Sequence, residues 1–140
     1  MSRKKILLAV DGSDYSNVVI DKAIEYAKVL GGEIVFVYCH KRFPAIIGQP
    51  YRDNEIASTI SGAEKLTKPF LQRLLNENIP VERRLMEEPA GTVISDVARI
   101  EKCDLIIMGS RGLTNLASLI VGSVTNRVLQ TAPCSVLVVR

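Results

Sequence analysis

The sequence predicts an α/β fold, with a five-stranded parallel β-sheet and helices on both faces. Five short apolar runs alternate along the chain with segments whose apolar residues recur at helical spacing. Four of these runs are dense in Val, Ile and Leu without polar alternation, which is typical of strands covered on both faces. This alternation indicates right-handed crossovers between parallel strands. The 140 residues are expected to form one domain over residues 1–140.

Each apolar run predicts one strand. The expected strands cover residues 6–10, 34–39, 81–86, 105–108 and Ser135–Val139. The third run, Val-Glu-Arg-Arg-Leu-Met, is more polar than the others. We therefore expect this strand at an edge of the sheet, where one side meets water.

The segments between the runs predict four helices. They are expected over about residues 15–30, 55–76 and 90–101, with a fourth that starts near Ser123 and stops before Pro133. Ser13 or Asp14 is expected to cap the first helix, and Gly31 to end it. Pro69 lies inside the second helix and predicts a kink or a break there. Residues 40–54 hold two prolines and one glycine, so they are expected to form the long loop.

Composition argues against several classes of function. The 18 basic residues are interspersed with 15 acidic ones, the net charge is +3, and aromatic residues make up 5%. This pattern indicates neither nucleic-acid nor membrane-surface binding. The apolar run at the start has five residues, too few for a signal peptide or a membrane span. Cys39, Cys103 and Cys134 are widely spaced and odd in number, which favours reduced thiols in the cytoplasm over a disulfide or a metal site.

Three places lie where ligands bind in open parallel sheets, beyond the carboxyl ends of the strands. They are Asp11-Gly12-Ser13 after the first strand, Cys39-His40 after the second, and the stretch from Gly109 after the fourth. Asp11 can accept hydrogen bonds from sugar hydroxyls, or form an Asx-turn or a helix cap. His40, the single histidine, is expected to be an ordinary loop residue at a strand end and not a catalytic one.

The stretch after the fourth strand, GSRGLTNLASLIVGS over residues 109–123, suggests a site for phosphate. Gly109 and Gly112 allow the main chain to turn sharply and to approach a ligand closely. Arg111, between them, can supply a positive charge or point to solvent. The alternative is that both glycines are simply turn residues.

The end of the same stretch opens the last helix. A helix N-terminus offers free N–H groups and the positive end of the helix dipole to an anion. Ser123 can cap this helix and also donate its hydroxyl to a phosphate oxygen, and Val124 adds a backbone N–H. The alternative is that Gly122-Ser123 is only a helix cap.

The spacing Gly109-x2-Gly112-x9-Gly122-Ser123 is similar to the ATP-binding signature of the universal stress protein family. The resemblance extends over essentially the whole chain. It includes the opening KKILLAVDGSDYS, the segment EEPAGTVISDVARIEKCDLIIMGSRG and the final GSVTNRVLQTAPCSVLVVR. The chain keeps every glycine of the signature, which places it with the ATP-binding branch of the family.

The resemblance implies a doubly wound five-stranded sheet of strand order 3-2-1-4-5, similar to the adenine nucleotide alpha hydrolase-like fold. It implies that Asp11 contacts the ribose and that the backbone near Cys39 meets the adenine edge. The residues implied at the phosphates are Gly109, Gly112, Gly122, Ser123 and Val124. ATP is the expected cofactor, with or without Mg²⁺. The segment Tyr38-Cys39-His40 stands where many members have His-Val. The residue that meets the adenine is therefore assigned only to within one position of Cys39.

The expected function is that of an ATP-binding universal stress protein that acts as a nucleotide-dependent switch or binding module. Two alternatives are an interaction protein that does not use nucleotide, and a weak ATPase. A dedicated ATPase is not expected, because the chain has no G-x-x-x-x-G-K-[ST] loop and no acidic residue directly after the fourth strand to hold Mg²⁺. In the strand order that the resemblance implies, Ser135–Val139 lies at an edge, and an apolar edge strand invites pairing with another chain. We therefore expect a homodimer joined through this strand, as the resemblance also implies.

A response-regulator receiver has a similar size and fold but requires other residues. It needs an acidic pair after the first strand, an aspartate after the third and a lysine after the fifth. The chain instead has Gly12 beside Asp11, Glu87-Glu88 after the third strand and Arg140 at its end. The receiver interpretation is therefore disfavoured.

Overall fold

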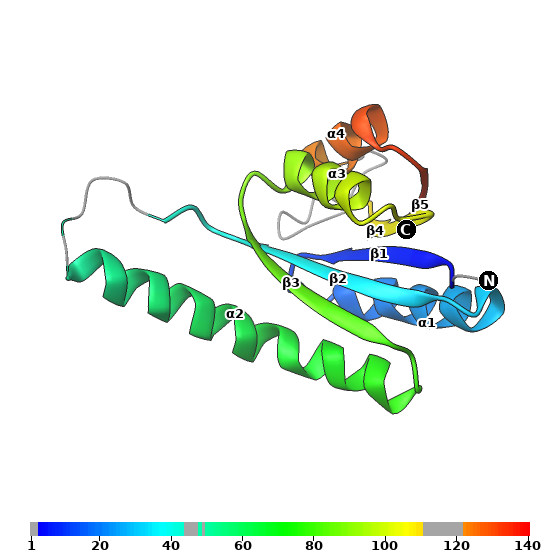
Figure 1. Cartoon of the computed structure of the whole chain (residues 1–140), viewed down its shortest axis with the longest axis horizontal. Coiled ribbons are helices and arrows are strands. Elements are labelled where there is room, and N and C mark those ends of the chain that lie inside the picture. The colour runs from blue at the N-terminus through cyan, green and yellow to red at the C-terminus, as the bar shows by residue number, and fades with distance from the viewer. Residues whose placement is uncertain (1–2, 44–47, 49, 111–121) are drawn as a thin grey trace.

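The computed structural model describes residues 3–43, 48, 50–110 and 122–140 (Figure 1). Within them, strands and helices alternate as predicted. The elements are β1 (Lys5–Val10), α1 (Ser16–Leu30), β2 (Glu33–His40), α2 (Tyr51–Asn76), β3 (Val81–Glu87), α3 (Ala90–Ile100), β4 (Leu105–Gly109), α4 (Ser123–Thr131) and β5 (Ser135–Val139).

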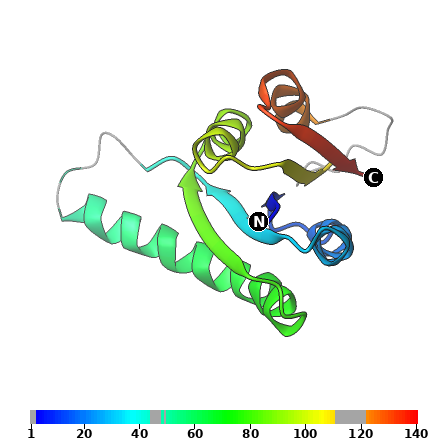
Figure 2. The same cartoon turned by 45° about the vertical axis from the view of Figure 1, so that its right-hand side comes forward.

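The strands form one parallel sheet in the order β3-β2-β1-β4-β5, as expected. Helices α1 and α2 cover one face, and α3 and α4 cover the other (Figures 1 and 2). The side chains of β1 alternate between the two cores: Ile6 and Leu8 pack with α1 and α2, whereas Leu7 packs with α3 and α4. Because β1 is buried on both faces, its sequence is a continuous apolar run.

The first helix begins differently from the prediction. Its N-cap position is Tyr15, no side chain caps it, and the first helical residue is Ser16. The prediction of a cap at Ser13 or Asp14 was therefore wrong; the Ser13 carbonyl instead accepts the N–H of Ser16 in a turn. Gly31 ends the helix with a φ of 61°, as predicted, because this left-handed conformation favours glycine.

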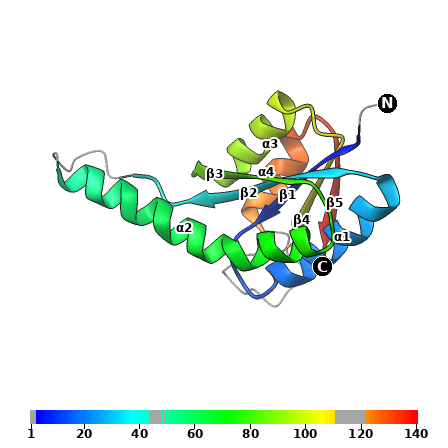
Figure 3. The ribbon, with the colours of Figure 1, turned by 60° about the horizontal axis from the view of Figure 1, so that its bottom comes forward.

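Helix α2 begins at Tyr51, four residues before the predicted start, so the loop is shorter than expected. It continues without a break through Pro69 and runs beyond the sheet at its N-terminal end (Figure 3). Proline inside a helix costs about 3 kcal/mol. Phe70 and Leu74 follow Pro69 and are buried in the core, and burying each stabilises the fold by roughly 1.5–3 kcal/mol. Their burial offsets the cost of the proline.

Helices α3 and α4 lie where the sequence predicts them. The N-cap of α4 is Gly122, so Ser123 is the first helical residue, and the prediction that Ser123 caps this helix was wrong. The helix ends at Thr131, just before Ala132 and Pro133. Over the described ranges, none of the helices combines the length and the apolar character needed to cross a bilayer.

Gly109, the last residue of β4, has a packing reason to be glycine. A Cβ there would lie 3.1 Å from two ring atoms of Tyr15 and 3.2 Å from a methyl group of Val19. The Tyr15 ring is itself held, because its hydroxyl donates to the Val139 carbonyl at 2.7 Å. The missing side chain lets α1 pack closely against the end of β4.

We expect Gly109→Ala to lower the free energy of unfolding by about 1–3 kcal/mol, since the new methyl group must displace Tyr15 or Val19. Urea unfolding measures this change. Gly62→Ala is the matched control, because Gly62 is exposed within α2 and its added Cβ meets no atom within 4 Å. This control should be stabilising by up to about 1 kcal/mol through helix propensity. Equal effects of the two substitutions would contradict the packing argument.

Candidate functional site

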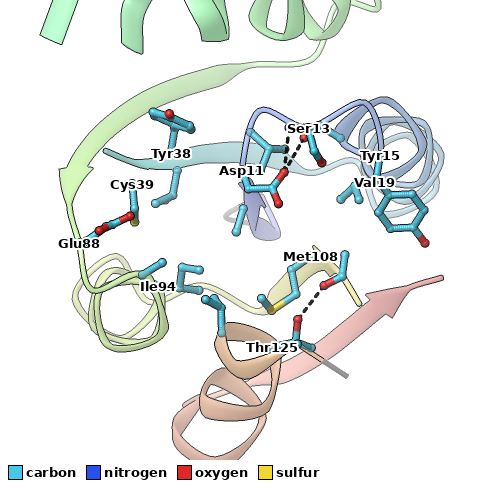
Figure 4. Close-up of a pocket in the computed structure, with 18 of the residues that line it drawn as sticks. Asp11, Ser13, Tyr15, Val19, Tyr38, Cys39, Glu88, Ile94, Met108 and Thr125 are labelled. Atoms are coloured by element: carbon cyan, nitrogen blue, oxygen red, sulfur yellow. Dashed lines mark hydrogen bonds between the residues drawn. The ribbon is translucent and has the colours of Figure 1, made fainter. Parts of the chain in front are cut away.

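A cavity of about 340 Å³ opens at the carboxyl edge of the sheet (Figure 4). It lies where the strand order reverses between β1 and β4, which is where ligands bind in doubly wound sheets. Six of the predicted site residues line it, namely Asp11, Cys39, Gly109, Gly122, Ser123 and Val124. The other two, Arg111 and Gly112, lie outside the described residues. The fold thus brings together every predicted site residue that the structure describes.

Asp11 follows β1 and is oriented by the turn that leads into α1. Its Oδ1 accepts the backbone N–H of Ser13 at 2.9 Å and the hydroxyl of Ser16 at 3.3 Å. This is the Asx-turn that the sequence left open as an alternative. Both of these bonds use the same carboxylate oxygen. The turn therefore fixes the carboxylate at the cavity while Oδ2 takes no part in it.

Ser13 brings a buried hydroxyl to the cavity. Its Oγ is buried and makes no hydrogen bond within the part of the chain that the structure describes. An unsatisfied buried hydroxyl costs about 1–3 kcal/mol, so a polar ligand atom here would recover this energy. The sequence placed Ser13 in one of the three expected ligand positions and also suggested it as a helix cap, but it did not predict that its hydroxyl is buried, because that burial depends on how the sheet and α1 meet.

The end of β2 forms the side of the cavity that carries Cys39. The register of β2 with β1 ends at the pair Val10 and Tyr38, whereas its register with β3 continues to His40. The His40 carbonyl accepts the N–H of Glu88 and so faces β3. Successive carbonyls of a strand point to opposite sides. The Cys39 carbonyl therefore faces the β1 side, beyond the last residue paired with β1.

The Tyr38 and Cys39 side chains at this end are uncharged at neutral pH. Burial, and then the nearby charge of Glu88, raise the pKa of the Cys39 thiol to about 11. Burial also raises the pKa of Tyr38, with smaller contributions from Asp11 and Glu88. A protonated thiol is a poor nucleophile. Cys39 is thus suited to packing against a ligand and not to attacking one.

The first turn of α4 forms the opposite wall. The Gly122 N–H donates to the Ser110 carbonyl at 3.1 Å, and the hydroxyl of Thr125 donates to the Gly109 carbonyl at 2.7 Å. These two bonds fasten the start of the helix to the end of β4. The N–H groups of Ser123 and Val124 have no acceptor within the helix, and none of the described side chains caps it. They form an anion-binding position with the positive end of the helix dipole.

Sequence reasoning missed several lining residues. Tyr38, Lys41, Glu88 and Thr125 belong to the cavity, together with apolar side chains that include Val37, Ile94 and Met108. No motif identifies these residues, because they lie on six different elements and connections that only the fold brings together. In the described ranges, no group of three or more His, Cys, Asp or Glu side chains is arranged to hold a metal ion.

His40 is not among the residues that line the cavity. It is the last residue of β2 and is 6% exposed, with its ring 4.8 Å from that of Phe43. Its Nδ1 lies 2.9 Å from the Lys41 carbonyl oxygen. The residue is therefore part of the strand and not of the loop, although it stands at the strand end as expected.

Solved structures with the same fold include three nucleotide complexes. A universal stress protein in complex with cAMP has a TM-score of 0.73 and is 20% identical, with 100% of this chain and 98% of that chain covered. One from Archaeoglobus fulgidus in complex with dAMP has a TM-score of 0.64 at 22% identity, with both chains fully covered. A family protein from Arabidopsis thaliana with AMP bound has a TM-score of 0.70 at 16% identity, covering 97% of this chain and 90% of that one. At these identities the likeness shows the fold.

Sequence comparison identifies the family. The model of the universal stress protein family matches residues 2–140. A universal stress protein of Thermus aquaticus is 34% identical over 139 residues, which cover 98% of each chain. Another, from Methanocaldococcus jannaschii, is 33% identical over 98% of this chain and 82% of its own length. The match to the family model over nearly the whole sequence, together with these relatives, shows that the chain belongs to the universal stress protein family.

Proposed function

We propose that this protein binds an adenine nucleotide, ATP in particular, and acts as a nucleotide-dependent switch or binding module in a stress response. The observation that carries the proposal is the convergence of Asp11, the buried Ser13 hydroxyl and the first turn of α4 on one cavity. The relatives with bound cAMP, dAMP and AMP support an adenine nucleotide as the ligand.

The cavity fits such a ligand in size and chemistry. Its volume of about 340 Å³ lies at the lower end of the range of small-molecule pockets, roughly 300–1,000 Å³. Carboxylate and hydroxyl groups lie toward the β1–α1 turn, apolar side chains form part of the lining, and free N–H groups lie at α4. These three kinds of surface correspond to the sugar, the base and the phosphate of a nucleotide.

The proposal assigns a role to each part of the lining. Asp11 and Ser13 bind the ribose hydroxyls, and the main chain at Cys39 meets the polar edge of adenine. Gly109 and Gly122 let the main chain approach the ligand, and Ser123 and Val124 bind phosphate through backbone N–H groups. Arg111 and Gly112 are proposed to complete the phosphate site, and Mg²⁺ to accompany the phosphates when ATP is bound.

The described lining favours holding ATP over hydrolysing it. Phosphoryl transfer needs an oriented nucleophile and concentrated positive charge at the transferred group. Asp11 is committed through Oδ1 to its turn, and the Cys39 thiol is protonated at neutral pH. We therefore propose a binding role, with slow hydrolysis as the competing hypothesis.

We further propose that residues 1–140 form a single domain and that two copies pair through β5. The strand lies at the edge of the sheet, and Val136, Leu137 and Val138 are only half-buried in the isolated chain. An edge strand of this kind can pair with another chain. The free thiols of Cys39, Cys103 and Cys134 support a reducing compartment such as the cytoplasm.

The nucleotide proposal predicts that the wild type binds ATP. Gly122→Val should lower the affinity for ATP at least about tenfold, because a side chain would stand where the main chain meets phosphate. Titration calorimetry with AMP, ADP and ATP measures this, after any co-purified nucleotide has been released and identified. Gly122→Ala tests the same position with less bulk, since its Cβ would come no nearer than 3.6 Å to the Ser110 carbonyl oxygen among the described atoms.

Two controls separate binding from folding and from hydrolysis. Gly62→Ala should leave nucleotide affinity unchanged, and urea unfolding should show that Gly122→Ala folds normally. A wild type that binds no adenine nucleotide would overturn the proposal and favour a nucleotide-independent interaction protein. ADP production that is lost in Asp11→Ala would favour the weak ATPase.

The raised pKa of Cys39 predicts a pH profile for alkylation. The thiolate is the reactive form, so the rate at Cys39 should be low at pH 7 and rise toward a midpoint near pH 11. Peptide mass spectrometry after brief iodoacetamide treatment measures this rate separately for each cysteine. Saturating ATP should slow the reaction at Cys39 but not at Cys134, which does not line the cavity. Fast alkylation of Cys39 at pH 7 would contradict its assigned burial.

The pairing proposal predicts a dimer in solution. Light scattering coupled to size exclusion should give twice the chain mass of 15.4 kDa at micromolar concentration. Val138→Pro should shift the mass toward the monomer, because proline removes a backbone donor from the edge. A wild type that is monomeric at these concentrations would reject pairing through β5.

A further inference from the structure

We propose that Tyr15 is a positioning residue for phosphate binding, because it fixes the end of β4 and, through it, the first turn of α4. The inference rests on the proposed nucleotide-binding function and adds a residue that acts on phosphate from a distance. Tyr15 is the N-cap residue of α1, whereas the proposed phosphate position is at the start of α4, more than a hundred residues later. Hydrogen bonds and one packing contact join the two places.

Tyr15 contacts the end of β4 with its ring and its hydroxyl. A Cβ on Gly109 would lie 3.1 Å from two atoms of the ring. The hydroxyl donates to the Val139 carbonyl at 2.7 Å, and the same carbonyl accepts the N–H of Ser110 at 2.9 Å. In Figure 4 the ring lies at the side of the cavity, with its hydroxyl toward the end of β5. Tyr15 therefore holds Gly109 directly and Ser110 through Val139.

The carbonyls of these two residues hold the start of α4. The Gly109 carbonyl accepts the hydroxyl of Thr125 at 2.7 Å, and the Ser110 carbonyl accepts the N–H of Gly122 at 3.1 Å. Gly122 is the N-cap of α4, and Thr125 belongs to its first turn. The two bonds thus lie on either side of the free N–H groups proposed to bind phosphate. Hydrogen bonds weaken steeply with misalignment, so a displaced turn would bind phosphate less well.

The role of the Tyr15 hydroxyl is indirect. A tyrosine has a single O–H donor, and that of Tyr15 is used on the Val139 carbonyl. Tyr15 therefore acts on phosphate through the turn and not by donating to it. The side chains that take part are well packed, since Ser110 is 8% and Thr125 3% exposed. Closely packed groups pass a displacement on to their neighbours.

The sugar side of the cavity is held by a different set of contacts. The Asp11 carboxylate accepts the N–H of Ser13 and the hydroxyl of Ser16, so these bonds lie within its own turn. They do not pass through the end of β4. Loss of the Tyr15 hydroxyl should therefore weaken the binding of phosphate more than that of the nucleoside.

The first test is titration calorimetry of Tyr15→Phe with adenosine, AMP and ATP. This variant keeps the ring and removes the hydroxyl. The affinity for AMP and ATP should fall about three- to tenfold, the range expected for one hydrogen bond, while that for adenosine changes less than about twofold. Tyr26→Phe is the matched control, because Tyr26 packs against the same core and does not line the cavity. Urea unfolding shows whether both variants are folded.

The second test uses the other hydroxyl that holds the turn. Thr125→Val should also weaken AMP and ATP more than adenosine, whereas Thr125→Ser keeps the hydroxyl and should bind within about twofold of the wild type. The double variant of Tyr15→Phe and Thr125→Val should lose less affinity for ATP than the product of the two single losses, because both residues act through one turn.

The third test needs no nucleotide. Hydrogen exchange followed by NMR reports how firmly the N–H groups of Ser110 and Gly122 are held. In Tyr15→Phe both should exchange about threefold faster or more, because the carbonyl network that holds them is loosened. In Tyr26→Phe their exchange should match that of the wild type.

The outcomes separate this inference from the proposed function. Equal losses for adenosine and the nucleotides in Tyr15→Phe, or no loss for the nucleotides, would overturn the inference while leaving nucleotide binding intact. Unchanged exchange at Ser110 and Gly122 would also overturn it. A wild type that binds no adenine nucleotide would show that the proposed function fails, and the exchange rates would then still decide whether Tyr15 holds the turn.

Discussion

The parallel pairing of β1 with β4 is the constraint on which the site depends. Leu7 lies opposite Ile106, and Ala9 lies opposite Met108, so both strands end at the same edge of the sheet. Both strands are buried between two layers of helices. The chain that follows each strand must therefore leave the sheet at this edge. The connection after β1 carries Asp11 to one side of the opening, while Gly109 stands at the other. The cavity is the space that this reversal of strand order leaves between the two connections.

A second set of contacts joins the cavity to the last strand. The Val139 carbonyl accepts both the Ser110 N–H, at 2.9 Å, and the Tyr15 hydroxyl, at 2.7 Å. Tyr15 lines the cavity and packs directly on Gly109. The wall of the cavity and the end of β5 are therefore held by the same few groups. A change in the position of Tyr15 would displace both the cavity wall and the end of β5, because closely packed interiors transmit displacement.

Much of the fold was predictable because the central strands are apolar on both faces. A short continuous apolar run such as ILLAV therefore indicates a buried strand of a parallel sheet. The helix starts were less predictable. The first turn of α2 contains Arg52, Asp53 and Asn54, which show no apolar periodicity, and α1 begins without a side-chain cap. The predicted site residues came from strand ends and from the resemblance to a family signature. Lys41 and Glu88 were missed, and so was the burial of the Ser13 hydroxyl, because these features follow from contacts between distant segments.

The charges around the opening are distributed unevenly, and this distribution bears on what the site can hold. Asp11, Lys41 and Glu88 lie on the cavity lining with the protonated Cys39 thiol, and Glu88 also lines, with Arg42 and Arg127, a groove beside the first turn of α4. Carboxylates accept hydrogen bonds from sugar hydroxyls and repel phosphates, whereas arginines attract phosphates. Asp11 and the α4 N-terminus lie on opposite sides of the cavity, and the helix N-terminus stabilises negative charge. A ligand with a neutral sugar and an anionic end is therefore favoured with its sugar at Asp11 and its anionic end at α4.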